Sequence, residues 1–278
     1  MVIANVLAVA GSDPSGGAGI QADVKAISAN GAFAMAALTA LTAQNTHGVT
    51  GVHLVPPDFV VQQIDTVAAD VRIDAVKVGM LGDADIAAAV ADALARVPGA
   101  PPIVLDPVMV ATSGSRLLDP AAVDVVVTRL LPLAAVVTPN LPEAAVMLGR
   151  PTASDRPAMQ EHADALIAAG ARAVLLKGGH LAGEDSPDLL LTAQGPTWLE
   201  APRVVTRNTH GTGCTLSSAL AAHVAAGVPL ADAVAAAKEY TRRAIAAADE
   251  LDVGSGHGPT HHFHDPGRRT GADAGARS

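Results

Sequence analysis

Short apolar runs alternate with longer segments of helical spacing along most of the chain. The runs are aliphatic and end in glycine or polar residues, which is typical of buried strands in a parallel sheet. They lie at 6–10, 75–79, 102–107, 135–138 and 173–177. This alternation predicts an α/β fold with a central, mostly parallel sheet and helices on both faces.

Helix signals fill the segments between these runs, with prolines and acids at the starts and Asn30-Gly31 at one end. The predicted helices cover 20–30, 57–69, 84–96, 119–130, 140–148, 156–169, 215–226 and 230–248. Two late runs, at 189–191 and 197–199, predict an antiparallel pair of strands. We find no repeat and no linker, so we expect one domain over 1–264 and a mobile tail at 265–278.

Composition excludes several classes of protein. The net charge is −9 and aromatic residues make up 2% of the chain, which argues against binding to duplex or single-stranded nucleic acid. A single cysteine, Cys214, rules out an intrachain disulfide and is typical of a reducing compartment. No apolar run reaches the ~20 residues of a membrane span, and no basic signal region begins the chain. We therefore expect a soluble, cytoplasmic protein.

Polar residues and glycines follow the ends of several predicted strands. In open α/β sheets, ligands bind at the carboxyl ends of the strands. The residues concerned are 11–19, Gln44, Asn45, Gly79, Met80, Asp106, Asn140, Glu143, 177–180 and 208–215. Their recurrence at one edge of the sheet predicts a ligand site there.

The stretch Asn208-Thr209-His210-Gly211-Thr212-Gly213-Cys214-Thr215 carries the clearest chemistry. A glycine turn that opens directly into a helix offers free N–H groups and the positive end of the helix dipole to an anion such as phosphate. Lys177 supplies a cation, and Asp106 and Glu143 supply carboxylates that suit Mg²⁺. This set favours phosphoryl transfer, which needs positioning and charge neutralisation. The chain contains no P-loop or protein-kinase signature.

Most of these residues also have a purely structural interpretation. Asp106 precedes a proline and could cap a turn, and Glu143 follows Asn140 by three residues, as in a capping box. Lys177 could extend over apolar surface, and Asp23 and Gln44 could be ordinary surface groups. The late histidines match no zinc-ligand spacing, so a polar tail is favoured over a metal site. They are His257, His261, His262 and His264.

Several motifs in fixed order resemble a known family, the bacterial hydroxymethylpyrimidine/phosphomethylpyrimidine kinases of thiamine biosynthesis. The resemblance covers roughly residues 5–264. It rests on Gly11-Ser12-Asp13-Pro14-Ser15-Gly16-Gly17-Ala18-Gly19-Ile20-Gln21-Ala22-Asp23, Ala43-Gln44-Asn45-Thr46, Val78-Gly79-Met80-Leu81, Leu105-Asp106-Pro107-Val108-Met109, Thr138-Pro139-Asn140-Leu141-Pro142-Glu143, Lys177-Gly178-Gly179-His180, the 208–215 stretch, and Gly258-Pro259 with His261-His262-Phe263-His264.

The resemblance implies a ribokinase-like fold and two ATP-dependent reactions. The first phosphorylates the hydroxymethyl group of 4-amino-5-hydroxymethyl-2-methylpyrimidine, and the second converts that monophosphate to the diphosphate. It also implies a general base at Cys214, whose thiol pKa we expect the helix N-terminus to lower from ~8.5. Gly211, Thr212 and Gly213 would donate N–H groups to the transferred phosphoryl group.

The remaining roles are likewise implied by the resemblance. Gln44 would bind the aminopyrimidine, and Asp23 and Met80 would line its pocket. The resemblance also implies residues that would bind the nucleotide. Lys177 would contact the ATP phosphates, and Asp106 and Glu143 would serve the Mg²⁺ and phosphate region.

Two other functions stay open at the level of sequence. One is a pyridoxine or pyridoxal kinase, because that vitamin is a similar ring with a hydroxymethyl group. Gln44 and the Gly-Thr-Gly-Cys run favour the pyrimidine. The other is a non-catalytic, pyrimidine-binding regulator on the same fold, against which the complete set of Asp106, Glu143, Lys177 and Cys214 argues. Family likeness also suggests a homodimer.

Overall fold

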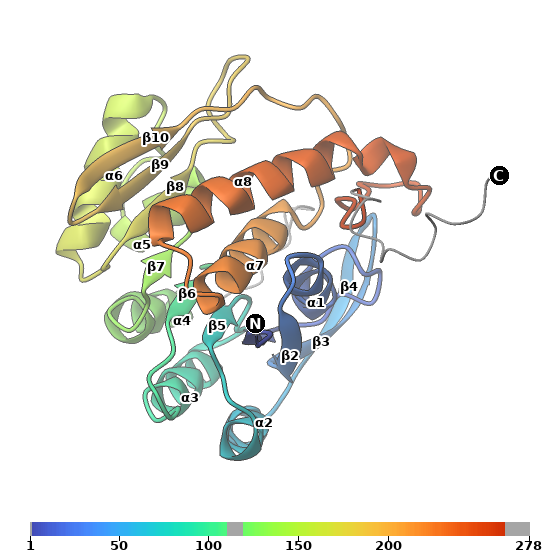
Figure 1. The fold of residues 1–278 in the computed structure, drawn as a ribbon, viewed down its shortest axis with the longest axis vertical. Helices are drawn as coiled ribbons and strands as arrows, with labels where there is room; N and C mark the ends of the chain where they lie inside the picture. Colours follow the sequence, from blue (N-terminus) through green and yellow to red (C-terminus); the bar gives the residue numbers. More distant parts are fainter. Residues whose placement is uncertain (1, 110–118, 265–278) are drawn as a thin grey trace.

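A computed structural model describes residues 2–109 and 119–264 of the 278-residue chain. Its centre is an eight-stranded sheet with the order β10-β9-β8-β7-β6-β5-β1-β2 (Figure 1). The six strands from β8 to β2 run parallel, whereas β9 and β10 are antiparallel to their neighbours. The predicted tail at 265–278 lies outside the described residues.

The strands of the large sheet are β1 (Asn5–Ala10), β2 (Phe33–Leu38), β5 (Ala75–Val78), β6 (Ile103–Leu105), β7 (Val136–Val137), β8 (Val174–Lys177), β9 (Asp188–Thr192) and β10 (Gly195–Leu199), and a separate hairpin pairs β3 (Ala40–Asn45) with β4 (Gly48–Leu54). The α-helices are α1 (Gly19–Ala29), α2 (Pro57–Asp70), α3 (Ala84–Leu94), α4 (Pro120–Val125), α5 (Leu141–Leu148), α6 (Arg156–Ala168), α7 (Thr212–Ala225) and α8 (Leu230–Ala246). A π-helical turn extends α4 over Val126–Leu130, and a 3-10 turn follows α8 at Ala248–Glu250.

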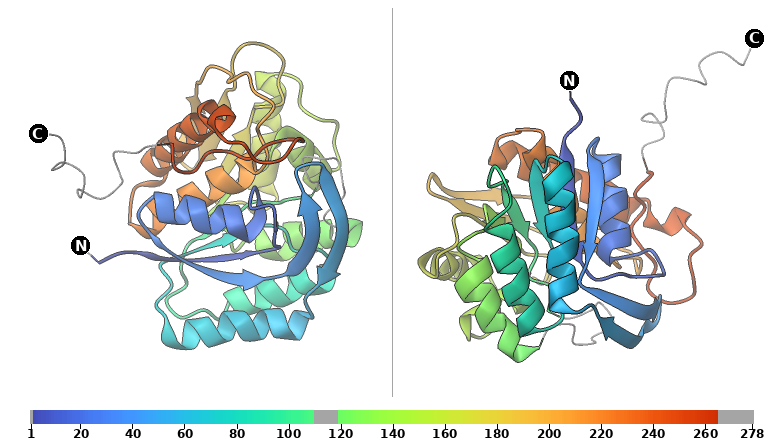
Figure 2. Two further views of the ribbon diagram at one scale, coloured as in Figure 1. Left: turned by 90° about the vertical axis from the view of Figure 1, so that its right-hand side faces the viewer. Right: turned by 90° about the horizontal axis from the view of Figure 1, so that it is seen from below.

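Helices cover both faces of the large sheet (Figures 1 and 2). Helices α1, α7 and α8 lie on one face, and α2 to α6 lie on the other. Strand β1 shows why the strand sequences are apolar throughout. Val6 and Ala8 pack into the core under α1 and α7, whereas Leu7 and Val9 pack into the opposite core. A strand buried on both faces has no polar side, as expected for a parallel sheet.

The predicted fold class and the antiparallel β9–β10 pair are confirmed. Helix α7 begins at Thr212, three residues before the predicted start, so its first turn includes Gly213 and Cys214. Strand β4 was not predicted, because nearly all of its residues are exposed and it has no apolar face. None of the described helices combines the length and the apolar character required to cross a bilayer.

Candidate active site

The carboxyl ends of β6 and β8 meet the first turn of α7. Lys177, the last residue of β8, places its Nζ 3.0 Å from Oδ1 of Asp106 and 3.8 Å from Oε2 of Glu143. A Cβ added at Gly213 would lie 3.4 Å from that Nζ and 3.5 Å from Oδ2 of Asp106. Four residues that are far apart in the sequence therefore form one cluster of a cation, two carboxylates and a helix N-terminus. Within this cluster, we call Lys177 and Asp106 the outer ion pair.

Asp106 is held by three donors. Lys177 and the hydroxyl of Thr138 donate to Oδ1, at 3.0 and 3.1 Å, and the hydroxyl of Ser217 reaches Oδ2 at 3.2 Å. Burial opposes ionisation of this carboxyl, but the charges of Lys177 and Lys77 and these hydrogen bonds outweigh it, and the pKa of Asp106 is lowered. Asp106 is therefore a carboxylate at neutral pH.

Glu143 both caps the start of α5 and belongs to the cluster around Lys177. Its Oε2 accepts the N–H of Asn140 at 2.7 Å, and the side chain of Asn140 accepts the N–H of Glu143, which completes a capping box at the start of α5. The same Oε2 faces Lys177. Burial raises the pKa of Glu143 to about 7, with the negative charge of Asp106 adding to the shift and Lys177 opposing it. A further cation at this position would favour the carboxylate form.

The glycine turn (residues 211–213) is fixed by close packing. Gly211 has φ 80°, in the left-handed region, and a Cβ there would collide with the carbonyl oxygen of Gly17. The N–H of Thr212 donates to the carbonyl of Thr209 at 3.3 Å, so this amide is already engaged. Within the described part of the chain, the amides of Gly211 and Gly213 have no such acceptor. The predicted anion cradle thus retains two of its three N–H groups.

The predicted direction of the pKa shift of the Cys214 thiol was wrong. Burial raises the pKa of Cys214 to about 11, although Lys77 opposes the shift, and the charges of Asp23 and Asp106 raise it further. A backbone N–H of Gly19 lowers the pKa but does not offset the loss of hydration. At neutral pH the thiol is therefore protonated in this structure.

Asp23 was predicted to line a substrate pocket, but its side chain is buried in this structure. The residue is 0% exposed, and its Oδ1 accepts hydrogen bonds from Lys77 Nζ and Ser218 Oγ, both at 2.8 Å. Lys77 is also 0% exposed. Oδ2 of Asp23 has no partner in the described structure. Asp23 and Lys77 form a sealed ion pair, which we call the inner ion pair, and neither side chain is exposed to solvent.

The first two turns of α7 contact both ion pairs through consecutive serines. Ser217 reaches Asp106 of the outer pair, and Ser218 reaches Asp23 of the inner pair. Residues four apart share a helix face, so Gly213 lies above Ser217 and Cys214 lies above Ser218. The glycine turn therefore faces the outer pair, and the thiol faces the inner pair.

Gln44 lies across from this turn on strand β3. Its Oε1 accepts from the hydroxyl of Thr42 at 3.2 Å, and its Nε2 is 3.4 Å from Nε2 of His210. His210 Nε2 is only 2.7 Å from Oδ2 of Asp13, so its hydrogen points at that carboxylate. The Gln44 amide consequently has no acceptor on the imidazole and keeps its donors for another partner.

Met80 follows β5 and is 7% exposed. Its carbonyl accepts from Thr39 Oγ1 at 2.7 Å, and its side chain packs against Gly11. It therefore lies between the ends of β1 and β5, at the same edge of the sheet as the other predicted residues.

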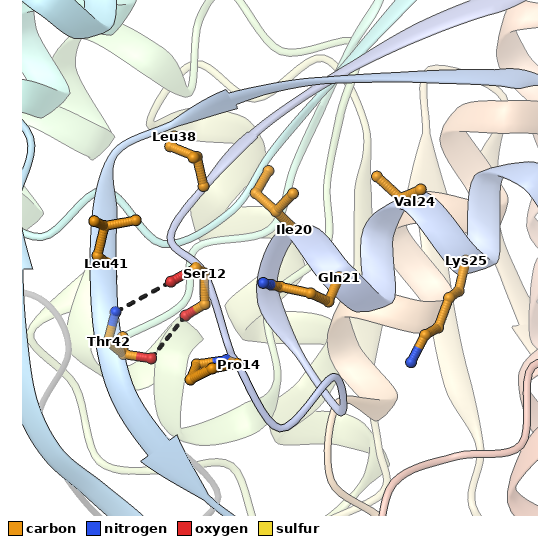
Figure 3. Close-up of a pocket in the computed structure, with 9 residues that line it drawn as sticks. All are labelled: Ser12, Pro14, Ile20, Gln21, Val24, Lys25, Leu38, Leu41 and Thr42. Atoms are coloured by element: carbon orange, nitrogen blue, oxygen red, sulfur yellow. Dashed lines mark hydrogen bonds between the residues drawn. The ribbon is translucent and has the colours of Figure 1, made fainter.

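A separate groove lies between α1 and strands β2 and β3 (Figure 3). Its walls are mainly apolar, and Lys25 is the charged residue among the described residues that line it; its Nζ donates to the carbonyl of Gly16 at 2.9 Å. Ser12 and Pro14, from the predicted glycine-rich loop at 11–19, line the groove, whereas Gln44, Asp106 and Lys177 do not. The groove therefore adjoins that loop and does not include the outer ion pair.

Sequence reasoning gave no individual role to three residues that shape the site, namely Lys77, Asp13 and His210. Lys77 had a usable signal, because it is a lysine in the middle of the apolar strand Ala75–Val78. Such a residue must find a buried acid. The Asp13–His210 contact joins residues 197 positions apart, and no local pattern announces it.

The chain matches known proteins along most of its length. The family model for phosphomethylpyrimidine kinase matches residues 13–261. A hydroxymethylpyrimidine/phosphomethylpyrimidine kinase of Escherichia coli (strain K12) is 53% identical over 260 residues, which covers 94% of this chain and 97% of the relative.

Two solved structures share the fold. A phosphomethylpyrimidine kinase from Clostridium difficile superposes with a TM-score of 0.76 at 37% identity and covers 87% of this chain and 99% of its own. Pyridoxal kinase from Staphylococcus aureus, in complex with AMP-PCP and pyridoxal, gives a TM-score of 0.86 at 32% identity and covers 94% of each chain.

The sheet, its helical layers and these structural relatives define a small-molecule kinase with the ribokinase-like fold. Within that class, the chain belongs to the phosphomethylpyrimidine kinase family.

Proposed function

We propose that this chain transfers a phosphoryl group from ATP to the hydroxymethyl group of 4-amino-5-hydroxymethyl-2-methylpyrimidine and then phosphorylates the monophosphate to the diphosphate, in thiamine biosynthesis. One observation carries the proposal beyond family membership. Lys177, Asp106 and the open amide of Gly213 meet at the carboxyl edge of the sheet. This arrangement binds and stabilises the charge that a phosphoryl group carries during transfer.

The proposed roles follow from the geometry. Lys177 would hold the phosphates of ATP, and the amides of Gly211 and Gly213 would donate to the transferred group. Asp106 and Glu143 both reach Lys177 and present hard oxygen ligands, so the donor set fits Mg²⁺ bound through one or two carboxylates. When bound, the metal would neutralise phosphate charge.

The pyrimidine would lie on the side of Gln44. Its side-chain amide has both donors and an acceptor, which matches a ring nitrogen beside an amino group. Met80 would close the same edge of the pocket. Asp23 has no place in this pocket, because it is sealed in the inner ion pair.

Cys214 is the proposed general base for the acceptor hydroxyl. Since its thiol is protonated in this structure, the base role requires that the thiol first lose its proton. Among the described residues, Lys77 supplies the charge that most favours the thiolate. Cys214→Ser should lower kcat by roughly 100-fold while the KM for the pyrimidine changes little. Near-wild-type turnover of this variant would show that another group accepts the proton.

Product analysis tests the proposed function directly. The protein is incubated with the pyrimidine alcohol and Mg²⁺-ATP, and the products are separated. Appearance of the monophosphate followed by the diphosphate is expected. Monophosphate alone would limit the chain to the first reaction.

A parallel assay addresses the alternatives. The pyridoxal kinase from Staphylococcus aureus is a structural relative, so pyridoxal is offered at equal concentration in the same experiment. Faster turnover of pyridoxal would make the chain a pyridoxal kinase. Binding of the pyrimidine without any phosphorylated product would instead favour a non-catalytic regulator.

We also propose that the enzyme acts in the cytoplasm, because its single, reduced Cys214 suits a reducing compartment. Family likeness supports a homodimer. Light scattering of the purified protein would decide between one and two copies, and cell fractionation would test the compartment.

A further inference from the structure

The segment that follows α8 returns to the glycine turn. The N–H of His210 donates to the carbonyl of Gly258 at 3.1 Å, and the N–H of Thr260 donates to the carbonyl of His210 at 3.3 Å. His261 N–H donates to the carbonyl of Ala244 in α8 at 2.9 Å. Residues 258–262 thus tie α8 to the residue that immediately precedes the turn. We call them the C-terminal strap.

A series of buried polar side chains runs through this strap. Tyr240 Oη lies 3.2 Å from His262 Nδ1, and His262 Nε2 lies 3.4 Å from Thr260 Oγ1. Thr260 Oγ1 lies 3.0 Å from Thr215 Oγ1, which donates to the carbonyl of Gly211 at 2.9 Å. Thr260 is 2% exposed, His262 is 5% exposed and Thr215 is 0% exposed. The series therefore links the partly buried Tyr240 on α8 to the first residue of the glycine turn through three buried side chains.

Hydrogen bonds hold the series at both ends. The hydroxyl of Thr215 donates to the carbonyl of Gly211 and also lies within hydrogen-bond distance of the hydroxyl of Thr260, where either oxygen can be the donor. At the other end, the hydroxyl of Tyr240 donates to the carbonyl of His262 at 3.2 Å and lies equally close to its Nδ1. The series therefore connects α8 to the glycine turn, and we call it the relay.

His262 stays neutral over the working range of pH. Burial lowers its pKa to about 4, and the positive charge of Lys25 and the neighbouring His264 and His261 contribute. Both of its ring nitrogens are used within the relay. In the described part of the chain, no group of three His, Cys, Asp or Glu is arranged to hold a metal ion.

We propose that this relay positions the glycine turn for phosphoryl transfer, and that Thr260 and His262 are positioning residues of the reaction. The relay ends on the carbonyl of Gly211, and the amide of Gly213 lies two residues further on, so a loosened relay would misplace the predicted phosphoryl donors. A displacement of about 1 Å in a catalytic group can cost 100-fold in rate. The inference rests on the proposed kinase function for its kinetic readout.

The test uses two substitutions at one position in the full-length protein. Thr260→Val keeps the volume of the side chain but removes its hydrogen bonds, and Thr260→Ser keeps the hydroxyl. Thr260→Val should lower kcat about tenfold, with the KM for the pyrimidine and for ATP within about twofold of wild type. Thr260→Ser should restore kcat to within about twofold.

A matched control separates positioning from loss of stability. Thr241 is also a buried threonine on α8, at 5% exposure, but its hydroxyl donates only within the helix, to Ala237 at 2.8 Å. Thr241→Val should keep kcat within about twofold even where its Tm falls as far as that of Thr260→Val. Equal loss of kcat in the two valine variants would overturn the inference, and so would wild-type kcat in Thr260→Val.

A second pair of variants decides the matter if Thr260→Val does not fold. His262→Gln keeps a donor near the position of Nε2, whereas His262→Leu removes it. The inference requires higher kcat in His262→Gln than in His262→Leu, and equal values would contradict it.

Hydrogen exchange gives a readout that does not depend on the substrate. The amides at 211–215 should exchange faster in Thr260→Val or His262→Leu than in wild type, and unchanged exchange would overturn the inference. If wild-type protein makes no phosphorylated pyrimidine, the proposed function fails, and the exchange data alone decide on the relay.

Discussion

Two lysine–aspartate pairs flank the start of α7, and they differ in access rather than in chemistry. The inner pair, Lys77 with Asp23, is 0% exposed on both sides. In the outer pair, the Lys177 side chain keeps 14% exposure beside Asp106. A sealed pair has no surface for a ligand, whereas the partly exposed Lys177 has the access that its proposed role at a phosphate requires. Closeness to a cysteine or to a helix N-terminus therefore does not by itself identify a binding residue.

The largest effect is expected from breaking the inner pair. Lys77→Met leaves the Asp23 carboxylate buried without its cation, which should lower the free energy of unfolding by about 3–5 kcal/mol. Denaturant unfolding followed by circular dichroism measures the change. The double variant Lys77→Met with Asp23→Leu should recover much of the loss, because a buried ion pair is often replaceable by apolar residues. No recovery in the double variant would mean that Lys77 stabilises the fold by other contacts.

Breaking the outer pair should act mainly on catalysis. Lys177→Met removes the cation that faces the predicted phosphates, and kcat should fall roughly 100-fold. Stability should fall less than in Lys77→Met, since Asp106 retains the hydroxyls of Thr138 and Ser217. Steady-state kinetics and a melting curve are measured on the same preparation. If this variant keeps its kcat but loses more unfolding free energy than Lys77→Met, the assignment of roles to the two pairs is reversed.

The consecutive serines of α7 provide the finest test. Ser218→Ala removes the hydroxyl bound to Asp23 and should cost about 1–2 kcal/mol of unfolding free energy. Ser217 shares its single hydrogen between Asp106 at 3.2 Å and the carbonyl of Gly213 at 2.9 Å, so Ser217→Ala should cost less. Denaturant titrations of the two variants compare them, and the reverse order would indicate that the outer pair depends more on its hydroxyls.

The sequence predicted most strands of the large sheet because its inner strands are buried on both faces. Such strands carry aliphatic runs that need no knowledge of their neighbours, as in β1 and β8. The exposed hairpin strand β4 has no such pattern and was missed. The same reasoning explains the helices, whose ends are marked by local residues such as Asn140 at the start of α5.

The site was predictable where its residues follow strand ends. Lys177, Asp106 and Glu143 were expected at one edge, and the structure brings them together. How deeply each side chain is buried was not predictable, because burial depends on partners that are distant in sequence. Asp23 meets Lys77 across 54 positions, and this contact removes it from the pocket. Burial likewise raises the pKa of Cys214, whereas the sequence predicted that the helix N-terminus would lower it.

The C-terminal strap also has a consequence for the order of events during synthesis. A chain emerging from the ribosome presents Gly211 well before Thr260, and about 50 residues separate the two. At ~5–20 residues per second, this gap lasts roughly 3–10 s. During that interval the nascent chain already contains every strand of the sheet but not the segment that fixes the glycine turn. A chain truncated shortly before residue 258 should therefore form the large sheet with Lys177 and Asp106 at its carboxyl edge, while its glycine turn lacks the contacts that position it.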